Sequence, residues 1–548
     1  MLTAIRIGNF KAFAETQRIP IRPLTLIYGA NSSGKSSVLH SMVLARHAQE
    51  TGDLDVHRTN VGGESVDLGG FRQYVHRREA NRRIEWAMDL DTSSFKDRLA
   101  ELFAPVKQVT VLLSLGIDLD DQDRPLPESI PEIHTYELLA DGQSLLRMSR
   151  RRDGKLHLDR LDHEHPVFRE VIKAMVLLST TTETIHPEDF EGLEEAIAEL
   201  VPEIVAKSTQ FLPDGLAESD VFSPGGQTRL FTISKAHRKE ELSAAVRSFL
   251  PRKIDELLKG VCQLVTGELS RLRYLGPLRS YPPRHLAFSQ HHDPNWFAGG
   301  GYAWDVVRRD ARVRELVNAW LSAPDRLQTP YELKLRHLLT IDDLDNDFRD
   351  IVMDIEEKVT ESGKYEDIEF TGDLFGEVYA ALEKIKKNEA KLTDIQELNL
   401  VDRRSDTIVS HRDVGIGVSQ VLPVLVSAYA SQNQIIAIEQ PEIHLHPALQ
   451  ADLGDVFIQS ALGESKNRFL IETHSEHLLL RIMRRMRETI NGKLPEGVQR
   501  ITPKDVCVLF VEPDGSRSLV REMPLNEDGE LVKAWPGGFF EEGLREVF

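Results

Sequence analysis

The pattern of apolar and polar positions at the start of the chain predicts strands followed by a helix. Apolar residues alternate with polar ones around positions 5–7 and 19–21, which is the period of a strand with one buried face. Residues 24–27 form a short apolar run that leads into a segment rich in glycine and serine, and residues 37–49 have helical spacing. We therefore expect a buried strand, a tight loop and a helix in direct succession.

The pattern changes twice along the rest of the chain. Residues from about 83 to 161 again alternate as strands do. Apolar residues in 193–206 and 240–258 recur instead at the three- and four-residue spacing of helices. The segment 274–284, which begins Tyr-Leu-Gly-Pro-Leu-Arg, has the composition of a strand followed by a proline-rich turn. From residue 399 onward, strand and helix patterns alternate once more.

These changes predict an α/β head, with a mixed sheet flanked by helices, that is split by a large and mainly helical insertion. We expect the N-terminal part of the head, with a β-rich lobe, at residues 1–165. The insertion would occupy 166–398, with a returning strand near 272–284 and a further helical region at about 304–391. The C-terminal part of the head would then be 399–548.

Composition and charge narrow the class of protein. The 548 residues are 41% hydrophobic and 28% charged, as in ordinary globular proteins. The net charge of -20 argues against a uniformly basic nucleic-acid coat, but it leaves room for DNA or RNA in a local basic groove. Two cysteines without CxxC spacing, short apolar runs and an N-terminus without a signal-peptide core predict a cytoplasmic protein with no membrane partner.

The glycine-rich segment after the first buried strand fits the phosphate-loop pattern G-x-x-x-x-G-K-[ST] with nothing missing. Its glycines let backbone N–H groups approach phosphate oxygens, and the positive end of the following helix faces the same anion. Lys35 is expected to reach the β- and γ-phosphates of ATP, and Ser36 to ligate Mg²⁺. A chance glycine-rich turn is the alternative. The candidate nucleotide-binding residues here are Gly29, Ala30, Asn31, Ser32, Ser33, Gly34, Lys35, Ser36 and Ser37.

Two later motifs fit the same chemistry. An apolar strand at 435–438 ends in Glu439, the place where a phosphate-loop fold puts the acid of the magnesium shell. Before it, Gly417, Ser419 and Gln420 open an apolar helix and offer a second anion-binding helix end. One subunit needs only one such end per nucleotide, so the pair predicts a head-to-head dimer, or a higher even oligomer, with ATP between subunits. A buried strand with an incidental acid, and an ordinary helix start, are the simpler alternatives.

A third strand, at 469–472, ends in Thr-His-Ser-Glu-His, which places His474 beside the first acid, where it can contact the γ-phosphate. The order of these motifs, with Glu-Gln-Pro-Glu-Ile-His-Leu-His-Pro at 439–447, resembles the ATPases of the overcoming-lysogenization-defect (OLD) group. These are relatives of the SMC, RecF and ABC ATPase heads and include AAA-labelled ATPases of bacterial anti-phage systems.

The resemblance covers about 1–75 and 399–548, and it implies an ABC-type head with an inserted arm. It makes 29–37 the Walker A motif, 415–420 the signature, Glu439 the Walker B acid and His474 the switch histidine. The segment 534–540 (Ala-Trp-Pro-Gly-Gly-Phe-Phe) resembles a tail of some of these ATPases and suggests no mechanism by itself.

Gln440 departs from the family pattern, because ABC-type heads carry a second acid directly after the Walker B acid. An amide cannot accept the proton of the attacking water as a carboxylate can. Either Glu442 or Glu472 acts as the base from a neighbouring position, or hydrolysis is slow and bound ATP works as a latch, with Gln440 orienting water. We favour slow hydrolysis.

The 74 residues after His474 are too few for the Toprim nuclease domain of OLD proteins, so a separate effector subunit, a nuclease or toxin, is the expected partner in anti-phage defence. A DNA-maintenance ATPase of the RecF or SMC kind and an ATP-locked scaffold are the alternatives. Basic residues offer candidate nucleic-acid contacts, although solvated faces or ion pairs are the simpler explanation. They are Arg150, Arg151, Arg152, Arg279, Arg481, Arg484, Arg485 and Arg487.

Overall fold

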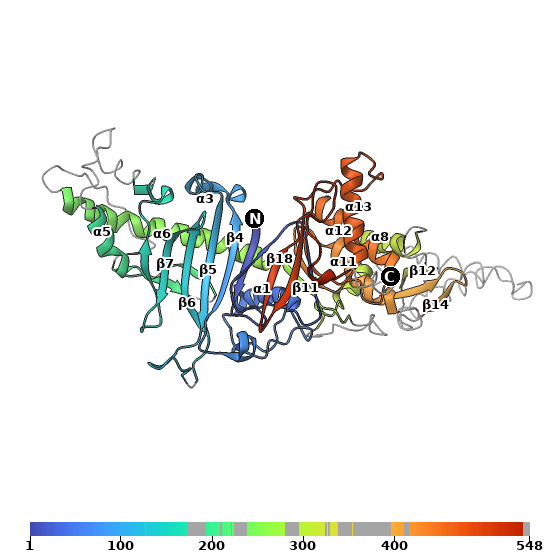
Figure 1. The fold of residues 1–548 in the computed structure, drawn as a ribbon, viewed down its shortest axis with the longest axis horizontal. Coiled ribbons are helices and arrows are strands. Elements are labelled where there is room, and N and C mark those ends of the chain that lie inside the picture. The colour runs from blue at the N-terminus through green and yellow to red at the C-terminus, as the bar shows by residue number, and fades with distance from the viewer. Residues whose placement is uncertain are drawn as a thin grey trace, which may run out of the picture. The chain divides into compact units, whose positions relative to one another are not determined.

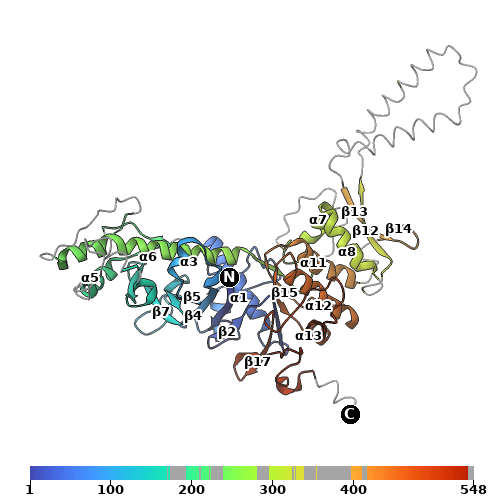
Figure 2. The same cartoon turned by 90° about the horizontal axis from the view of Figure 1, so that it is seen from above.

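The chain folds into two compact units that interleave along the sequence. The computed structural model describes residues 1–126, 128–169, 171–172, 193–208, 211–220, 222–223, 238–279, 295–323, 326, 329–337, 353, 396–409 and 416–540. The first unit draws on Met1–Arg279, Pro294–Gly300 and Ser427–Phe548, and the second on Ser280–Asp293 and Gly301–Val426. Figures 1 and 2 show the ribbon from two directions.

A six-stranded sheet forms the centre of the first unit. Its order is β11-β15-β16-β3-β17-β18, and its first five strands are parallel. β3, β15 and β16 are buried at every position, which agrees with the mainly apolar residues in the middle of each strand. The strands are β3 (Leu24–Gly29), β11 (Leu272–Leu275), β15 (Ile435–Glu439), β16 (Arg468–Glu472), β17 (Val506–Asp514) and β18 (Arg517–Glu522).

Three helices of this unit begin next to the carboxyl ends of its parallel strands. α1 (Lys35–Thr51) follows β3, α12 (Pro447–Leu462) follows β15, and α13 (Glu476–Ile490) follows β16. Proline at the first position of α12 favours a helix start there. The Ser475 side chain caps α13 by accepting a hydrogen bond from the Leu478 N–H at 3.1 Å.

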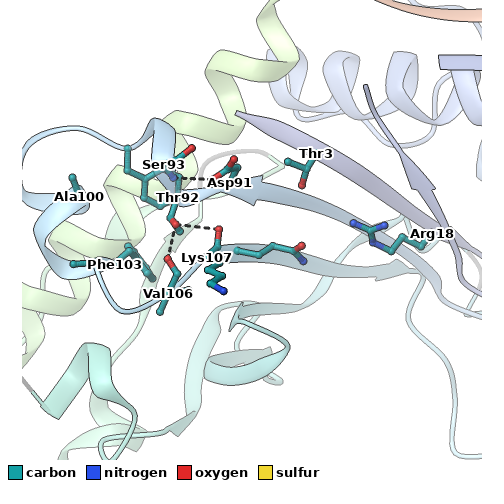
Figure 3. Close-up of a pocket in the computed structure, with 12 residues that line it drawn as sticks. Thr3, Arg18, Asp91, Thr92, Ser93, Ala100, Phe103, Val106 and Lys107 are labelled. Carbon is teal, nitrogen blue, oxygen red and sulfur yellow. Dashed lines mark hydrogen bonds between the residues drawn. The ribbon is translucent and has the colours of Figure 1, made fainter. Parts of the chain in front are cut away.

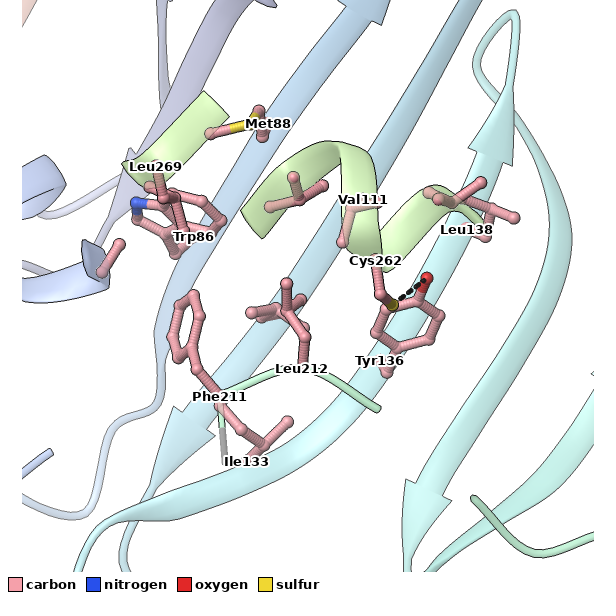
Figure 4. Close-up of a cluster of buried hydrophobic side chains, with 14 of the residues drawn as sticks. Trp86, Met88, Val111, Ile133, Tyr136, Leu138, Phe211, Leu212, Cys262 and Leu269 are labelled. Atoms are coloured by element: carbon pink, nitrogen blue, oxygen red, sulfur yellow. Dashed lines mark hydrogen bonds between the residues drawn. The ribbon is translucent and has the colours of Figure 1, made fainter. Parts of the chain in front are cut away.

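A seven-stranded antiparallel sheet, β2-β1-β4-β5-β6-β7-β8, forms a lobe in the same unit. The long helix α6 (Arg238–Ser270) lies along this sheet (Figure 2). Leu269 and Cys262 of α6 pack with Trp86, Val111 and Tyr136 of the strands (Figure 4). The strands are β1 (Leu2–Gly8), β2 (Gln17–Pro20), β4 (Ile84–Asp91), β5 (Gln108–Gly116), β6 (Glu132–Ala140), β7 (Gln143–Arg150) and β8 (Leu156–Leu161).

Smaller elements complete the lobe. The short helices are α2 (Phe71–Tyr74), α3 (Asp97–Leu102) and α5 (Leu193–Leu200), and β9 (Ala206–Ser208) pairs with β10 (Pro213–Leu216). The helix expected at 193–206 therefore ends earlier, and a single 3₁₀ turn with Pro202 follows it. Proline has no backbone N–H to donate, and its ring clashes with the preceding helical turn, which favours the end of the α-helix here.

The described part of the second unit pairs two helices with a small sheet. α7 (Tyr302–Arg309) leads into α8 (Ala311–Ser322), which Asp310 caps by accepting from the Val313 N–H at 3.1 Å. The antiparallel sheet is β12 (Tyr331–His337), β13 (Gln396–Asp402) and β14 (Thr407–Val409). α11 (Ile416–Ala430) begins in this unit and ends in the first. Much of the helical region expected at 304–391 lies outside the described residues.

A mixed sheet flanked by helices confirms the predicted α/β class. The two units follow contacts rather than the three expected stretches of sequence, because α6 and β11, which fall within 166–398, belong to the first unit. Within the described residues, no helix combines the length and apolar character needed to cross a bilayer.

Candidate functional site

The glycine-rich loop joins β3 to α1 as the sequence predicts. Gly29 has a φ of 149°, and a Cβ at this position would lie 2.3 Å from the Val511 carbonyl oxygen. Gly34 has a φ of 97°, and a Cβ there would lie 2.4 Å from the Cβ of Ala12. Both values are below any real contact distance, so only glycine fits. The loop therefore keeps its backbone close to β17 and to the N-terminal segment.

Lys35 and Ser36 both face the carboxylate of Glu472. The Lys35 Nζ donates to the carbonyl oxygens of Gly29 (3.2 Å) and Ala30 (2.9 Å) and lies 3.9 Å from Glu472 Oε1. The Ser36 Oγ donates to Glu472 Oε2 at 2.7 Å. Burial lowers the pKa of Lys35, although Glu472 and Glu439 oppose this.

The two acids lie side by side because their strands are parallel and in register. Glu439 of β15 pairs with Glu472 of β16, which in turn pairs with Ile27 of β3. Burial and the neighbouring Glu439 raise the pKa of Glu472 to about 7, against the opposing effects of Ser36 and Lys35. The sequence indicated Glu472 only as an alternative base. Its position opposite Ser36 depends on the strand order, which places β16 between β15 and β3.

Three further side chains surround Glu439, none of which the sequence assigned to the site in these roles. The Tyr274 hydroxyl donates to Glu439 Oε1 at 2.8 Å, and His40 Nε2 lies 3.1 Å from the same oxygen. Arg279 Nη2 donates to the Glu439 backbone carbonyl at 2.8 Å. Tyr274 and Arg279 come from the Tyr-Leu-Gly-Pro-Leu-Arg segment, so this segment adjoins the strand end that bears the acid.

Gln440, Glu442 and His474 connect the loops after β15 and β16. The Gln440 N–H donates to the Glu472 carbonyl oxygen at 2.7 Å, and its φ of 44° is unusual for a residue with a side chain. Glu442 is buried, which raises its pKa, and its Oε1 accepts from the His474 N–H at 2.7 Å. His474 is half-buried, and burial together with the charge of Lys35 lowers its pKa.

Two family models match parts of the chain. A family model described as "AAA ATPase domain" matches residues 311–479, a range that includes Glu439 and His474. A family model described as a protein of unknown function (DUF3696) matches residues 501–548. The part of the chain from 311 to 479 thus matches an ATPase domain. The predicted ATPase character of the α/β head is thereby confirmed.

No curated protein matches the sequence of this ATPase. Among solved structures it is similar to an Smc head bound to the C-winged helix domain of ScpA, with 9% identity and a TM-score of 0.35 over 96% of this chain and 98% of that one. It is also similar to an Smc head with an extended coiled coil bound to the C-terminal domain of ScpA, from Pyrococcus furiosus. The identity is 11% and the TM-score 0.33, over 100% of this chain and 98% of that one. A third similar structure is the SMC head domain from Thermotoga maritima, with 8% identity and a TM-score of 0.32 over 96% of this chain and 99% of that one.

The residues predicted to form the signature motif open α11. Ser419 and Gln420 are buried and Gly417 is half-buried in the first turns of this helix. They belong to the second compact unit, and the preceding residues, including Gly415, lie outside the described part of the chain.

The tail segment 534–540 docks next to the phosphate loop. Tyr28, which precedes Gly29 on β3, packs edge-on against Trp535 and Phe540 with ring centroids 5.4 Å and 5.7 Å apart. Phe510 of β17 packs against Trp535 (5.7 Å). The Tyr28 hydroxyl donates to the Ser475 carbonyl oxygen at 3.1 Å. The tail thus adjoins the strand that leads into the predicted Walker A loop.

Most of the arginines proposed as nucleic-acid contacts have acidic or backbone partners in the ATPase. Arg481 and Arg485 of α13 form ion pairs with Asp455 of α12 at 2.6 Å and 2.7 Å. Arg279 is buried against backbone carbonyls, a role that the sequence did not predict. The remaining pairs are Arg484 with Glu488, Arg150 with Glu132, and Arg151 with Asp159.

A cavity of about 750 Å³ lies on the lobe (Figure 3). Thr92, Ser93, Phe103 and Lys107 line it, together with Arg18, whose guanidinium binds Asp89 at 3.0 Å. No lining residue belongs to the phosphate loop or to the acidic strand ends, so this cavity is separate from the candidate nucleotide site.

Proposed function

We propose that this chain is an ABC-type ATPase that binds ATP and Mg²⁺ at residues 29–37 and hydrolyses the nucleotide slowly. The observation that carries the proposal is the meeting of Lys35 and Ser36 with the Glu472 carboxylate. This contact lies at the strand edge that also bears Glu439. A lysine, a hydroxyl and two acids around a glycine-rich loop form the set of groups that phosphoryl transfer needs.

The loop is suited to hold phosphate groups. Its backbone N–H groups and the positive end of α1 attract anions, and Lys35 adds a full charge. The Ser33 hydroxyl is 1% exposed and has no hydrogen-bond partner among the described residues. Buried hydroxyls are rarely left in this state, so a phosphate oxygen that accepts from Ser33 fits the loop.

The acids of the site fit a magnesium ion. Ser36, Glu439 and Glu472 offer hard oxygen donors, which are the ligands that Mg²⁺ prefers. Burial and the neighbouring Glu439 raise the pKa of Glu472, so a cation bound between the two acids would stabilise their charged forms. Ser36 and Glu439 would hold the ion, with Glu472 beside them. The bound ion would neutralise the charge that develops on the phosphates.

Slow turnover follows from the residue after Glu439. Gln440 offers an amide where a carboxylate base is usual, and an amide cannot take up the proton of the attacking water. Each neighbouring acid has one oxygen engaged, because Glu442 Oε1 accepts from the His474 N–H and Glu472 Oε2 accepts from Ser36. Gln440 then orients the water while proton removal limits the rate, and ATP persists as a latch.

Two copies would close on the nucleotide. The Gly417–Gln420 start of α11 is a second helix end able to bind an anion, beyond the one at α1. Light scattering should show the mass of a dimer, or of a higher even oligomer, for wild type with ATP and Mg²⁺. Ser419→Arg should remain at the mass found without nucleotide. Equal masses for both proteins in ATP would refute the sandwich.

In the cell, the resemblance carried by residues 439–447 and 473–477 supports a cytoplasmic regulator of a separate nuclease or toxin in anti-phage defence. Purification of the chain with its native gene neighbours, followed by mass spectrometry, tests this role. A bound neighbour whose toxicity changes with ATP occupancy supports the role. DNA-stimulated ATP hydrolysis by the isolated chain, with no bound neighbour, supports a DNA-maintenance ATPase instead.

Nucleotide binding itself is tested with a fluorescent ATP analogue. Lys35→Ala should weaken its affinity by about 100-fold, because a charge-assisted contact of roughly 3 kcal/mol is lost. Lys504→Ala, a change at an exposed lysine, is the matched control and should leave affinity unchanged. Wild-type protein that fails to bind the analogue, or equal affinities for wild type and Lys35→Ala, would overturn the proposal.

A further inference from the structure

We infer that Tyr274 and His40 are positioning residues for the Glu439 carboxylate, and that Lys11 sets the hydrogen-bonding state of His40. This inference rests on the proposed function, since it assigns a role at the same site. The residues come from three separate parts of the first unit: the N-terminal segment, α1 and the end of β11.

The two donors converge on one oxygen of the acid. The Tyr274 hydroxyl lies 2.8 Å from Glu439 Oε1, and His40 Nε2 lies 3.1 Å from the same atom. The two rings also pack edge-on, with centroids 6.3 Å apart. Tyr274 is 3% exposed and the His40 side chain 13% exposed. Bulk water is therefore a poor substitute for either donor.

Lys11 determines which ring nitrogen of His40 carries the proton. The Lys11 Nζ lies 2.7 Å from His40 Nδ1. An ammonium group has only donors, so Nδ1 must be the acceptor in this contact. Nε2 then carries the hydrogen and donates it to Glu439.

The arrangement leaves the acid with one oxygen held and the other available. Within the described part of the chain, both hydrogen-bond donors to this carboxylate engage Oε1, so Oε2 is the oxygen left for a metal ion. Hydrogen bonds to a ligating carboxylate fix its orientation, and their loss typically weakens metal binding by about 10- to 100-fold.

The backbone of the same strand end is also fixed. Arg279 Nη2 donates to the carbonyl oxygens of Glu439 at 2.8 Å and of Gln440 at 3.4 Å. Gln440 holds a φ of 44°, which costs free energy unless neighbours stabilise it. The Tyr-Leu-Gly-Pro-Leu-Arg segment thus holds both the side chain of the acid, through Tyr274, and the turn that follows it.

The test measures how nucleotide affinity depends on Mg²⁺, a property that a purely structural role would not change. Affinity for a fluorescent ATP analogue is titrated across Mg²⁺ concentrations and also in excess EDTA. Tyr274→Phe and His40→Leu should each raise the Mg²⁺ concentration for half-maximal binding by about 10-fold or more. Their affinity in EDTA should equal that of wild type.

Matched variants separate positioning from packing. Tyr136→Phe removes another buried hydroxyl, which contacts Cys262 in the lobe, and should leave the Mg²⁺ dependence unchanged. His40→Gln keeps an N–H donor and should restore most of the Mg²⁺ affinity lost in His40→Leu. Lys11→Met should fall between wild type and His40→Leu, since the ring is free to change tautomer.

The outcomes distinguish this inference from the proposed function. Wild type that fails to bind the analogue overturns both. Wild type that binds with a clear Mg²⁺ dependence, shared unchanged by Tyr274→Phe and His40→Leu, overturns the inference alone. If the variants lost equal affinity for the analogue in EDTA and in Mg²⁺, the inference would also be overturned, because the substitutions would then have a general effect on the site.

Discussion

Ser36 and Glu472, which are 436 positions apart in the sequence, meet through a hydrogen bond of 2.7 Å. One residue opens the helix after the phosphate loop, and the other ends the strand beside it. Their contact brings the N-terminal and C-terminal parts of the ATPase head together at the atoms that would hold the metal ion.

Glu472→Gln should weaken Mg²⁺-dependent nucleotide binding. An amide keeps the size of the side chain and can still accept from Ser36, but it removes a negative charge next to the ion. We expect the Mg²⁺ concentration for half-maximal binding to rise by about 10-fold. Glu522→Gln, a change on β18 away from the loop, serves as the control. If Ser36→Ala raised the Mg²⁺ requirement and Glu472→Gln did not, Glu472 would have no part in the metal site.

Gln440→Glu should raise the steady-state rate of ATP hydrolysis. A carboxylate at this position can accept the proton of the attacking water, and a general base contributes about 100-fold or more to such reactions. We expect an increase of at least about 10-fold in phosphate release, with little change in ATP affinity. Gln432→Glu on the protein surface is the control. An unchanged rate would show that the base lies elsewhere and would remove the argument for an ATP latch.

Asp455→Ala should strongly destabilise the fold. Asp455 is 6% exposed and binds both Arg481 and Arg485. Its loss removes the acid that these two cations share between α12 and α13 and leaves them with Asp452 and Glu488. Breaking a buried pair of this kind costs about 3 kcal/mol in the free energy of unfolding. Arg404→Ala breaks an exposed, solvent-screened pair with Asp402 and should change the free energy of unfolding little. Chemical denaturation compares the two variants. Similar losses in the free energy of unfolding would contradict the assignment of Asp455 as a buried ion-pair partner.

Trp535→Ala should lower stability and loosen the tail. Trp535 packs against Tyr28, Phe510 and Phe540, and removing a half-buried indole from such a cluster costs roughly 2 kcal/mol. Val532→Ala, at a side chain that is 59% exposed, should change the free energy of unfolding little. Faster hydrogen exchange over β3 in Trp535→Ala would accompany the loss. Unchanged exchange there would show that the tail does not support the phosphate-loop strand.

Local patterns in the sequence were enough to predict the strand, loop and helix around Lys35. A buried strand, a fixed glycine spacing and a helix are contiguous there, and each has its own signal. The acid at Glu439 was equally predictable, because an apolar run that stops at a carboxylate is visible without knowing its neighbours. The α/β class followed from the same alternation of strands and helices.

Long-range pairing was not predictable in the same way. The contacts of Glu472 with Ser36, and of Tyr274 with Glu439, depend on which strands are adjacent, and periodicity contains no information about strand order. The basic cluster on α13 offered candidate nucleic-acid contacts in the sequence, with a solvated face or ion pairs as the simpler explanation. Its Asp455 partner lies on another helix, so only the packing of α12 against α13 reveals the ion pairs.

The central position of β3 has a consequence for synthesis on the ribosome. β3 emerges early, but both of its sheet neighbours, β16 and β17, come from near the far end of the chain. The lobe strands β1, β2 and β4 to β8 all come from the N-terminal part of the chain and can pair while translation continues. A truncated chain that ends before β16 would therefore contain the lobe strands, but β3, the strand before the phosphate loop, would lack both of its sheet neighbours. Such a product would be a target for chaperones and proteases rather than a partly active ATPase.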